Sequence, residues 1–211
     1  MALYKKTLDA VKTLDAEIIA ATKEFETEKA KVMETYKDPS TYLQPIRDKY
    51  TKRVADGKKV FNETMHANFA EVRKKINEYV TTPVPADFAG TMEVVIVTGK
   101  AITDYEVKAF TEKYKENYLA FRTLVELMHQ QGKATDILIR YPDSIVKEME
   151  NIERMLQRWS QDYKSNDYMT GLWKNDTNPL TELETYTEEF LQGNFILDEE
   201  EAAIVSALKT R

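Results

Sequence analysis

The sequence predicts an all-α fold, and three observations lead to that prediction. The 211 residues include only 6 glycines and 6 prolines, so long helices can run without interruption. Apolar residues recur at spacings of three, four and seven over most of the chain, which is the period of helices. The one stretch of strand-like composition, from Val94 to Val97, has no second strand of similar quality with which to pair.

The first predicted domain, residues 1–80, is a long antiparallel helical hairpin that resembles a coiled coil. A helix over residues 2–36 carries an apolar row with a seven-residue repeat, which is typical of a coiled-coil seam. The row consists of Tyr4, Val11, Ile18, Phe25 and Val32. Pro39 ends this helix, because the residue before a proline leaves the helical region. A second helix with Pro45 in its first turn runs to about residue 80, and the short connection makes the two helices antiparallel neighbours.

The second predicted domain, residues 81–211, is a smaller helical domain with an acidic C-terminal segment. Two prolines in the stretch 81–85 favour an extended linker, which sets the boundary between the domains. The stretch 86–98 has the β-branched residues of a strand. A lone strand would leave its backbone groups unsatisfied, so we expect a short buried helix that Gly99 caps.

Four further helices are indicated by capping and spacing signals. Thr103 and Glu106 form a capping box that opens a helix ending at Gly132. The remaining three are expected over residues 142–159, 179–192 and 199–209. Tyr168 and Trp173 lie in a polar break between them, where an aromatic side chain can act as an interface anchor.

Charge is distributed unevenly along the chain. The net charge is +3 in residues 1–80, −9 in residues 81–211 and −6 overall. Between Asn175 and Leu208 there are nine acidic residues and no Lys or Arg. This segment is either a docking arm for a basic partner or a pair of capped, solvent-facing helices.

The composition argues against several classes of site and partner. Without cysteine there is no disulfide, no thiolate metal site and no Cys nucleophile. The longest apolar run falls far short of the roughly 20 residues of a membrane helix, and the start has no signal-peptide core, so we expect a cytoplasmic protein without a membrane partner. The basic residues between Arg47 and Lys75 are interrupted by acids, which argues against a nucleic-acid partner. The sequence has no glycine-rich phosphate-binding loop and no Gly-x-Ser-x-Gly motif of a nucleophilic serine. We therefore expect no cofactor.

The two histidines form the sharpest candidate for chemistry. Each follows a glutamate by three residues, as Glu63 and His66, and as Glu126 and His129. Two Glu-x-x-His motifs are a feature of di-iron carboxylate bundles, whose ligands point into the bundle. On a helical wheel both glutamates lie roughly 140–160° from the apolar face of their helix. We therefore expect surface residues and no bound metal, with a metal-dependent helical-bundle enzyme as the alternative.

One segment resembles a known group of proteins. The run from Gly99 to Arg122, GKAITDYEVKAFTEKYKENYLAFR, is similar to a segment of uncharacterised α-helical proteins from bacteriophages and prophages of Gram-positive bacteria. In those proteins a Gly-Lys-x-Leu-Thr start leads into a helix with a Lys-Tyr-x-x-Asn-Tyr core. Here Ile102 replaces the usual Leu, and Glu116 stands where a glycine is common. The resemblance covers about 30 of the 211 residues. It carries no catalytic residues, and it implies a phage or mobile-element origin, hence the host cytoplasm or a virion.

The expected function is that of a non-enzymatic structural or assembly protein that acts through protein–protein contacts. The seven-residue seam calls for a partner helix, supplied by a second copy of the chain or by another protein. The predicted contact residues are the row Tyr4, Val11, Ile18, Phe25 and Val32, together with Trp173. A small regulatory binder that inhibits a host protein through the acidic surface is the first alternative, and the metal-dependent enzyme is the second.

Overall fold

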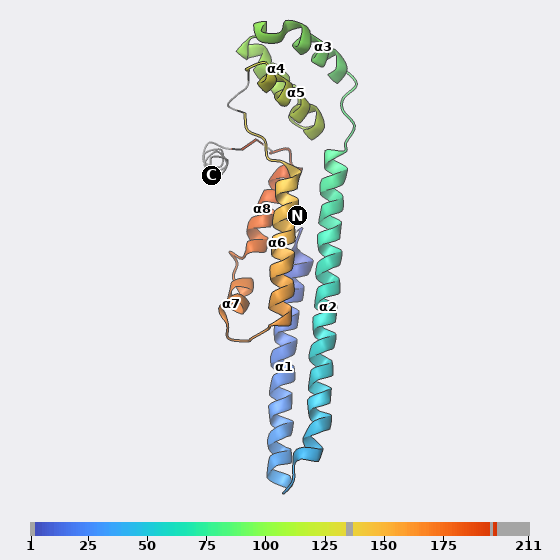
Figure 1. Cartoon of the computed structure of the whole chain (residues 1–211), viewed down its shortest axis with the longest axis vertical. Helices are drawn as coiled ribbons and strands as arrows, with labels where there is room; N and C mark the ends of the chain where they lie inside the picture. Colours follow the sequence, from blue (N-terminus) through green and yellow to red (C-terminus); the bar gives the residue numbers. More distant parts are fainter. Residues whose placement is uncertain (1–2, 134–136, 195, 198–211) are drawn as a thin grey trace. The chain divides into compact units, whose positions relative to one another are not determined.

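The computed structural model confirms the all-α fold and the long antiparallel hairpin (Figure 1). It describes residues 3–133, 137–194 and 196–197. Within these residues the β-structure is limited to one isolated bridge between Ile139 and Ile196. The helices are α1 (Lys5–Thr35), α2 (Ser40–Val80), α3 (Phe88–Thr98), the 3-10 helix η1 (Gly99–Ala101), α4 (Asp104–Tyr114), α5 (Tyr118–Gln130), α6 (Pro142–Gln161), α7 (Tyr168–Lys174) and α8 (Pro179–Leu191). No helix of the described part of the chain is long and apolar enough to cross a membrane.

The chain divides into two compact units, each built from two segments of the sequence. Unit 1 comprises Met1–Val72 and Glu148–Glu184, and unit 2 comprises Arg73–Lys147 and Thr185–Arg211. The predicted division at residue 80 gives each domain one continuous segment, and the observed division differs from it. The physical reason is that α6 packs along α2, where Ser160 hydrogen-bonds Asn62, so C-terminal helices share the core of the hairpin.

The hairpin of unit 1 turns in four residues between α1 and α2. The Asp38 carboxylate accepts hydrogen bonds from the hydroxyl and the backbone N–H of Ser40, at 2.7 and 3.4 Å, and so supports the first turn of α2. The helix therefore begins five residues earlier than Pro45, which lies inside α2 and not in its first turn as predicted. The proline signal was misleading because the contact with Asp38 already starts α2 at Ser40.

Gly57 has a packing role within the hairpin. A Cβ atom at this position would lie 3.4 Å from Leu14 Cδ1 of α1, at the lower limit of ordinary van der Waals contact. Gly57 therefore faces the buried Leu14 across the hairpin.

Helices α6 and α7 add further layers to unit 1. The ring of Phe61 packs edge-on against Trp159 of α6, with 5.5 Å between the ring centroids. Trp173 of α7 is only 1% exposed. On α1, buried Asp15 accepts a 2.5 Å hydrogen bond from Tyr163 and pairs with Lys174, which fixes the segment between α6 and α7 against the hairpin.

Unit 2 contains a core of its own around α3, α4 and α5. Its buried members are Phe88, Val95, Ile102, Val107, Tyr114, Ala120, Leu124 and Met128. The predicted capping box is present, because Thr103 accepts from the Glu106 N–H and Glu106 accepts from the Thr103 N–H. The predicted single helix up to Gly132 is instead two helices, since Asn117 caps a new start by accepting from Ala120 N–H at 2.9 Å. Gly132 ends α5 with a φ of +75°, as its glycine identity allows.

The stretch 86–98 is mostly helical, as expected, but it is not a buried helix. Phe88, Thr91 and Val95 are its buried residues. The valines and the isoleucine beside them face solvent, because α4 and α5 cover only one side of α3. The predicted helix over residues 199–209 lies outside the described residues.

Candidate protein-interaction surface on the helical hairpin

The residues of the predicted seam on α1 become less buried from the start of the helix to its end. Tyr4 and Val11 are fully buried and Ile18 is 5% exposed, whereas Phe25 and Val32 are half-buried. The first three pack within unit 1, so their side chains are not available to a partner in this conformation. The sequence repeat is the same throughout, and only the number of covering layers differs.

The change coincides with the end of the third layer. Contacts between α2 and α6 run from His66 and Glu153 to Lys58, whose ammonium donates to the carbonyl of Gln161 at 2.8 Å. Gln161 is the last residue of α6. Beyond Lys58 the described part of unit 1 consists mainly of α1 and α2. We call residues 22–56 the hairpin tip.

The hairpin tip has an incompletely covered apolar seam. Its apolar seam residues are half-buried: Phe25, Val32, Ile46, Tyr50 and Val54. Leu43 is its one buried apolar side chain among the described residues. Outside the seam, Met33 is 55% exposed, and the rings of Tyr36 and Tyr42 stack on each other at 3.9 Å. Two helices bury only one face each, so the tip keeps apolar surface that a third layer could cover.

Ion pairs hold the two helices of the tip together. Arg53 of α2 bridges Glu17 and Glu24 of α1 at 2.6 Å each, and Lys49 bridges Glu24 and Glu28 at 2.5 and 2.9 Å. The hydrogen bond from Arg53 lowers the pKa of Glu17, and that from Lys49 lowers the pKa of Glu24. These carboxylates therefore remain charged at neutral pH. The pairs are solvent-exposed, so they set the alignment of the helices more than their stability.

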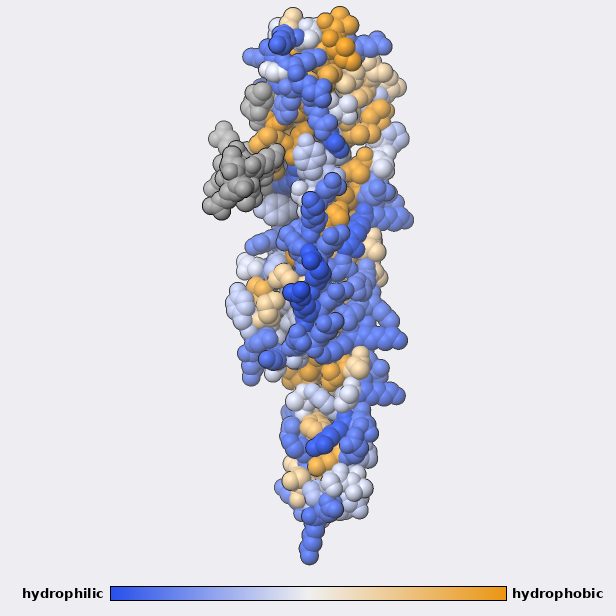
Figure 2. Space-filling model, viewed as in Figure 1, coloured by the Kyte–Doolittle hydropathy of each residue, from blue (hydrophilic) through white to orange (hydrophobic). Residues whose placement is uncertain are grey.

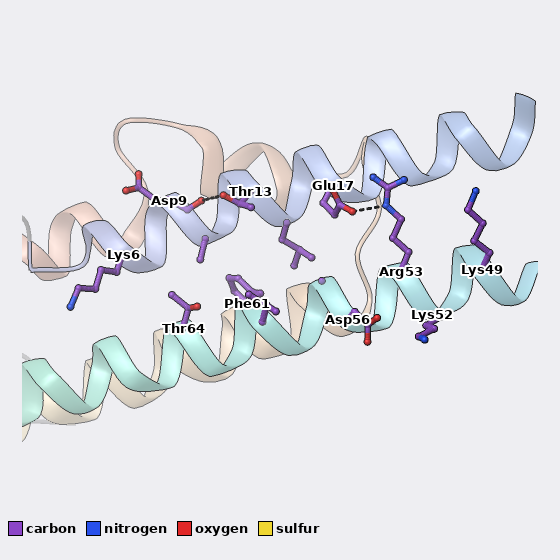
Figure 3. A pocket seen from close by; sticks show the side chains of 14 residues that line it. Lys6, Asp9, Thr13, Glu17, Lys49, Lys52, Arg53, Asp56, Phe61 and Thr64 are labelled. Atoms are coloured by element: carbon purple, nitrogen blue, oxygen red, sulfur yellow. Dashed lines mark hydrogen bonds and ion pairs between the residues drawn. The ribbon is translucent and has the colours of Figure 1, made fainter.

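A groove of about 780 Å³ runs between α1 and α2 at the base of the tip (Figure 3). Leu14, Gly57, Val60 and Phe61 provide its apolar part. Charged side chains of both helices form its rim, and Figure 3 shows Arg53 reaching across to Glu17. Val60 is 61% exposed although it lies among apolar neighbours. An apolar floor with a charged rim is the surface that an amphipathic helix can cover.

A second groove of about 460 Å³ lies beside Tyr50 and Val54. Ile18 and Ile19 of α1 also line it, and Ile19 is 46% exposed. Tyr163 and Ser165, from the segment that follows α6, complete its lining. The first groove and this one share no residue, so apolar surface is accessible at two separate places on unit 1. In Figure 2 apolar patches interrupt the charged surface along this part of the hairpin. Periodicity alone did not identify Ile19, because it lies beside the seven-residue row.

The two Glu-x-x-His motifs lie on different units and differ in their contacts. Glu63 is exposed and lies 4.0 Å from Lys59. His66 is also exposed, and its ring nitrogens contact Glu153 at 2.6 Å and Gln157 at 3.1 Å. Glu126 pairs with Arg122 at 2.7 Å, and His129 is half-buried on the next turn of α5. Within the described residues no three His, Asp or Glu side chains are grouped to hold a metal ion.

The acidic segment is partly engaged by the protein itself. Glu184 accepts a hydrogen bond from the backbone N–H of Leu3 at 2.5 Å in unit 1. Glu189 pairs with buried Arg140 at 3.1 Å in unit 2. Residues 195 and 198–208 of the segment lie outside the described part of the chain. Of the two aromatic residues in the polar break, Trp173 is buried and Tyr168 is 81% exposed, so Tyr168 is the accessible one.

Comparison with known proteins adds no functional assignment. No protein-family model, curated protein or solved structure matches the chain.

Proposed function

We propose that this chain is a non-enzymatic assembly protein that self-associates through its hairpin tip. In the native assembly a helix from a second copy covers the tip and forms the third layer that α6 provides nearer the core of unit 1. The resemblance around residues 99–122 supports placing this role in a phage or prophage, as a scaffold or minor head-like component.

The observation that carries the proposal is the half-burial of Phe25 and Val32. They continue a row whose earlier members, Tyr4, Val11 and Ile18, are buried by intramolecular layers. Seven-residue spacing favours a supercoiled partner helix, and at Phe25 and Val32 the described layers of unit 1 leave room for one. A second copy supplies a helix with that same spacing, so its side chains can interdigitate with those of the tip.

Burial of apolar surface at the tip favours the proposed association. A fully buried Phe or Val side chain contributes about 1.5–3 kcal/mol relative to an exposed one. Half-buried residues realise only part of that contribution within the monomer. Several half-buried apolar residues lie in line along the two helices of the tip. Their combined burial makes association favourable enough to offset the loss of motional freedom on binding.

A double substitution at the tip tests the proposal. We expect light scattering of the wild-type protein to give a mass above the 24.5 kDa of one chain. Phe25→Glu together with Val32→Glu should lower that mass, because four charges would meet in each two-copy contact. Circular dichroism of the variant should retain the helical signal, since both positions are already partly exposed.

Thr27→Glu together with Ala30→Glu is the matched control. These residues lie on the solvent-exposed side of the same helix, and they add the same charge. We expect their mass to equal that of the wild type. A wild-type protein that is monomeric at high micromolar concentration would contradict the proposal and favour a monomeric inhibitor of a host protein.

A further inference from the structure

Helix α3 of unit 2 has an apolar face that the described residues leave uncovered. Val94, Ile96 and Val97 are 50%, 59% and 86% exposed. Ala89 and Gly90 lie on the same exposed side, and a Cβ atom at Gly90 would have no neighbour within 4 Å. In Figure 2 apolar surface gathers over this helix. A clustered apolar face of this kind marks an interaction site on a protein surface.

The charges around this face follow a symmetric pattern. Glu93 lies on the exposed face, and Lys100 follows it by seven residues in η1. Neither side chain has a hydrogen bond or an ion pair among the described residues. Along the sequence, the midpoint between Glu93 and Lys100 falls between Ile96 and Val97, which are the two most exposed apolar residues of the face, and Lys100 lies just beyond the end of α3 at Thr98.

We propose that α3 pairs with α3 of a second copy, antiparallel and about a two-fold axis near residues 96 and 97. In this register Glu93 of each copy faces Lys100 of the other, which forms two equivalent ion pairs. Ile96 of one copy meets Val97 of the other at the axis. Val94 faces Gly99 of the other copy, where the absent side chain leaves room.

A second copy is the occupant that this pattern specifies. A two-fold interface requires that residue i meets residue j while j meets i, so the surface must be complementary to itself. The sequence from Glu93 to Lys100, with its acid, two apolar residues and base at equal distances from the centre, meets that condition when reversed.

Cysteine cross-linking detects this contact directly, because the natural chain contains no cysteine. Val97→Cys places a thiol beside its symmetry mate at the two-fold axis. We expect this variant to form a disulfide-linked dimer under mild oxidation at micromolar concentration. Tyr105→Cys is the matched control, since Tyr105 is 84% exposed against 86% for Val97 but lies on α4. It should cross-link at least tenfold more slowly.

Charge reversal then tests the register within the Val97→Cys protein. Glu93→Lys alone places two lysines opposite each other, and Lys100→Glu alone places two glutamates opposite each other. Each single change should lower the cross-linking rate several-fold, and the double change should restore it because the pairs re-form with exchanged signs. Lys108→Glu, an exposed lysine of α4, makes the same charge change away from the face and should leave the rate unaltered.

The contact on α3 is independent of the proposed contact at the hairpin tip. Equal rates for the cysteines at 97 and 105, or no recovery in the double charge reversal, would overturn the α3 pairing. Those outcomes leave the mass change caused by Phe25→Glu and Val32→Glu unaffected. Conversely, the cysteine at position 97 can cross-link rapidly while Phe25→Glu and Val32→Glu leave the mass unchanged. That result would support the α3 pairing and contradict the hairpin interface.

Discussion

At the scale of single residues, buried polar contacts fix how the helices meet. Asp15 is the clearest case, because it is a 6% exposed carboxylate on a helix whose other buried residues are mainly apolar. It binds the hydroxyl of Tyr163, in the segment between α6 and α7, and the ammonium of Lys174, the last residue of α7. Burial and the neighbouring Asp15 raise the pKa of Tyr163, so this phenol stays protonated and donates its hydrogen bond.

Replacing Asp15 tests this role. We expect Asp15→Ala to lower the free energy of unfolding by about 2 kcal/mol, because the part-buried hydroxyl of Tyr163 and the ammonium of Lys174 lose their acceptor. Urea denaturation at pH 7 measures the change. Asp9→Ala on the same helix is the control, since the Asp9 carboxylate forms an exposed pair with Lys5, and its effect should be within about 0.5 kcal/mol. Equal effects of the two substitutions would show that Asp15 has no special role.

Ionisation of Tyr118 is expected to make the folding stability depend on pH in alkaline solution. Burial raises its pKa to about 12, from an ordinary value of 10.0. The unfolded chain therefore releases this proton near pH 10, while the folded protein keeps it, so folding stability falls as pH rises from about 10 to 12. We expect Tyr118→Phe to reduce that fall by up to about 2 kcal/mol in denaturation series across this range. An unchanged slope would mean that Tyr118 ionises at its ordinary pH in the folded state.

At the scale of helices, end signals decide where each element stops. The break between α4 and α5 depends on Asn117, whose side-chain oxygen caps α5 while its amide nitrogen donates to the carbonyl of Pro83 at 3.0 Å. The apolar spacing continues across the break, which is why spacing alone predicts one helix. The Asn117 cap therefore starts a new helix although the apolar pattern is continuous.

Asn117 is therefore expected to contribute to the stability of unit 2. Asn117→Ala removes the cap and should lower the unfolding free energy by about 1 kcal/mol. Asn117→Asp keeps the oxygen acceptor and loses the donor to Pro83, so its effect should be smaller. Chemical denaturation followed by circular dichroism compares the two variants. A loss equal for both would assign the effect to the Pro83 contact and not to the cap.

At the scale of the whole molecule, the two proposed contacts belong to different units of one chain. The hairpin tip lies in unit 1 and the exposed face of α3 lies in unit 2. A protein with two self-association surfaces can join more than two copies, which suits an assembly role.

Combining the substitutions gives a stepwise prediction. We expect the wild-type mass in light scattering to exceed that of a dimer at high micromolar concentration. The tip variant Phe25→Glu and Val32→Glu should leave a dimer through α3, and Glu93→Lys, which weakens the α3 contact, should shift the mass towards that of a dimer through the tip. All three substitutions together should shift the mass towards that of the 24.5 kDa monomer. A combined variant that still associates would show that a third surface links the copies.

The sequence by itself determined the helical class, the hairpin and several helix ends. These features depend on local physics: the spacing of apolar residues, the capping box of Thr103 and Glu106, and the positive φ that Gly99 and Gly132 adopt. The outward placement of Glu63, which is exposed, also agrees with its position on the helical wheel. Neighbours within a few residues are sufficient for such inferences, because helices form through short-range contacts.

Only the tertiary structure decided which parts of each pattern are covered. Tyr4 and Phe25 belong to one repeat, yet α6 and α7 pack in unit 1 near the start of that repeat and not at its far end. Val95 and Val97 likewise share one helix, but α4 and α5 bury only the first. Burial depends on residues far away in the sequence, and a single sequence does not state which distant segments meet. For that reason the candidate surfaces, at the hairpin tip and on α3, became visible only when the helices were placed against one another.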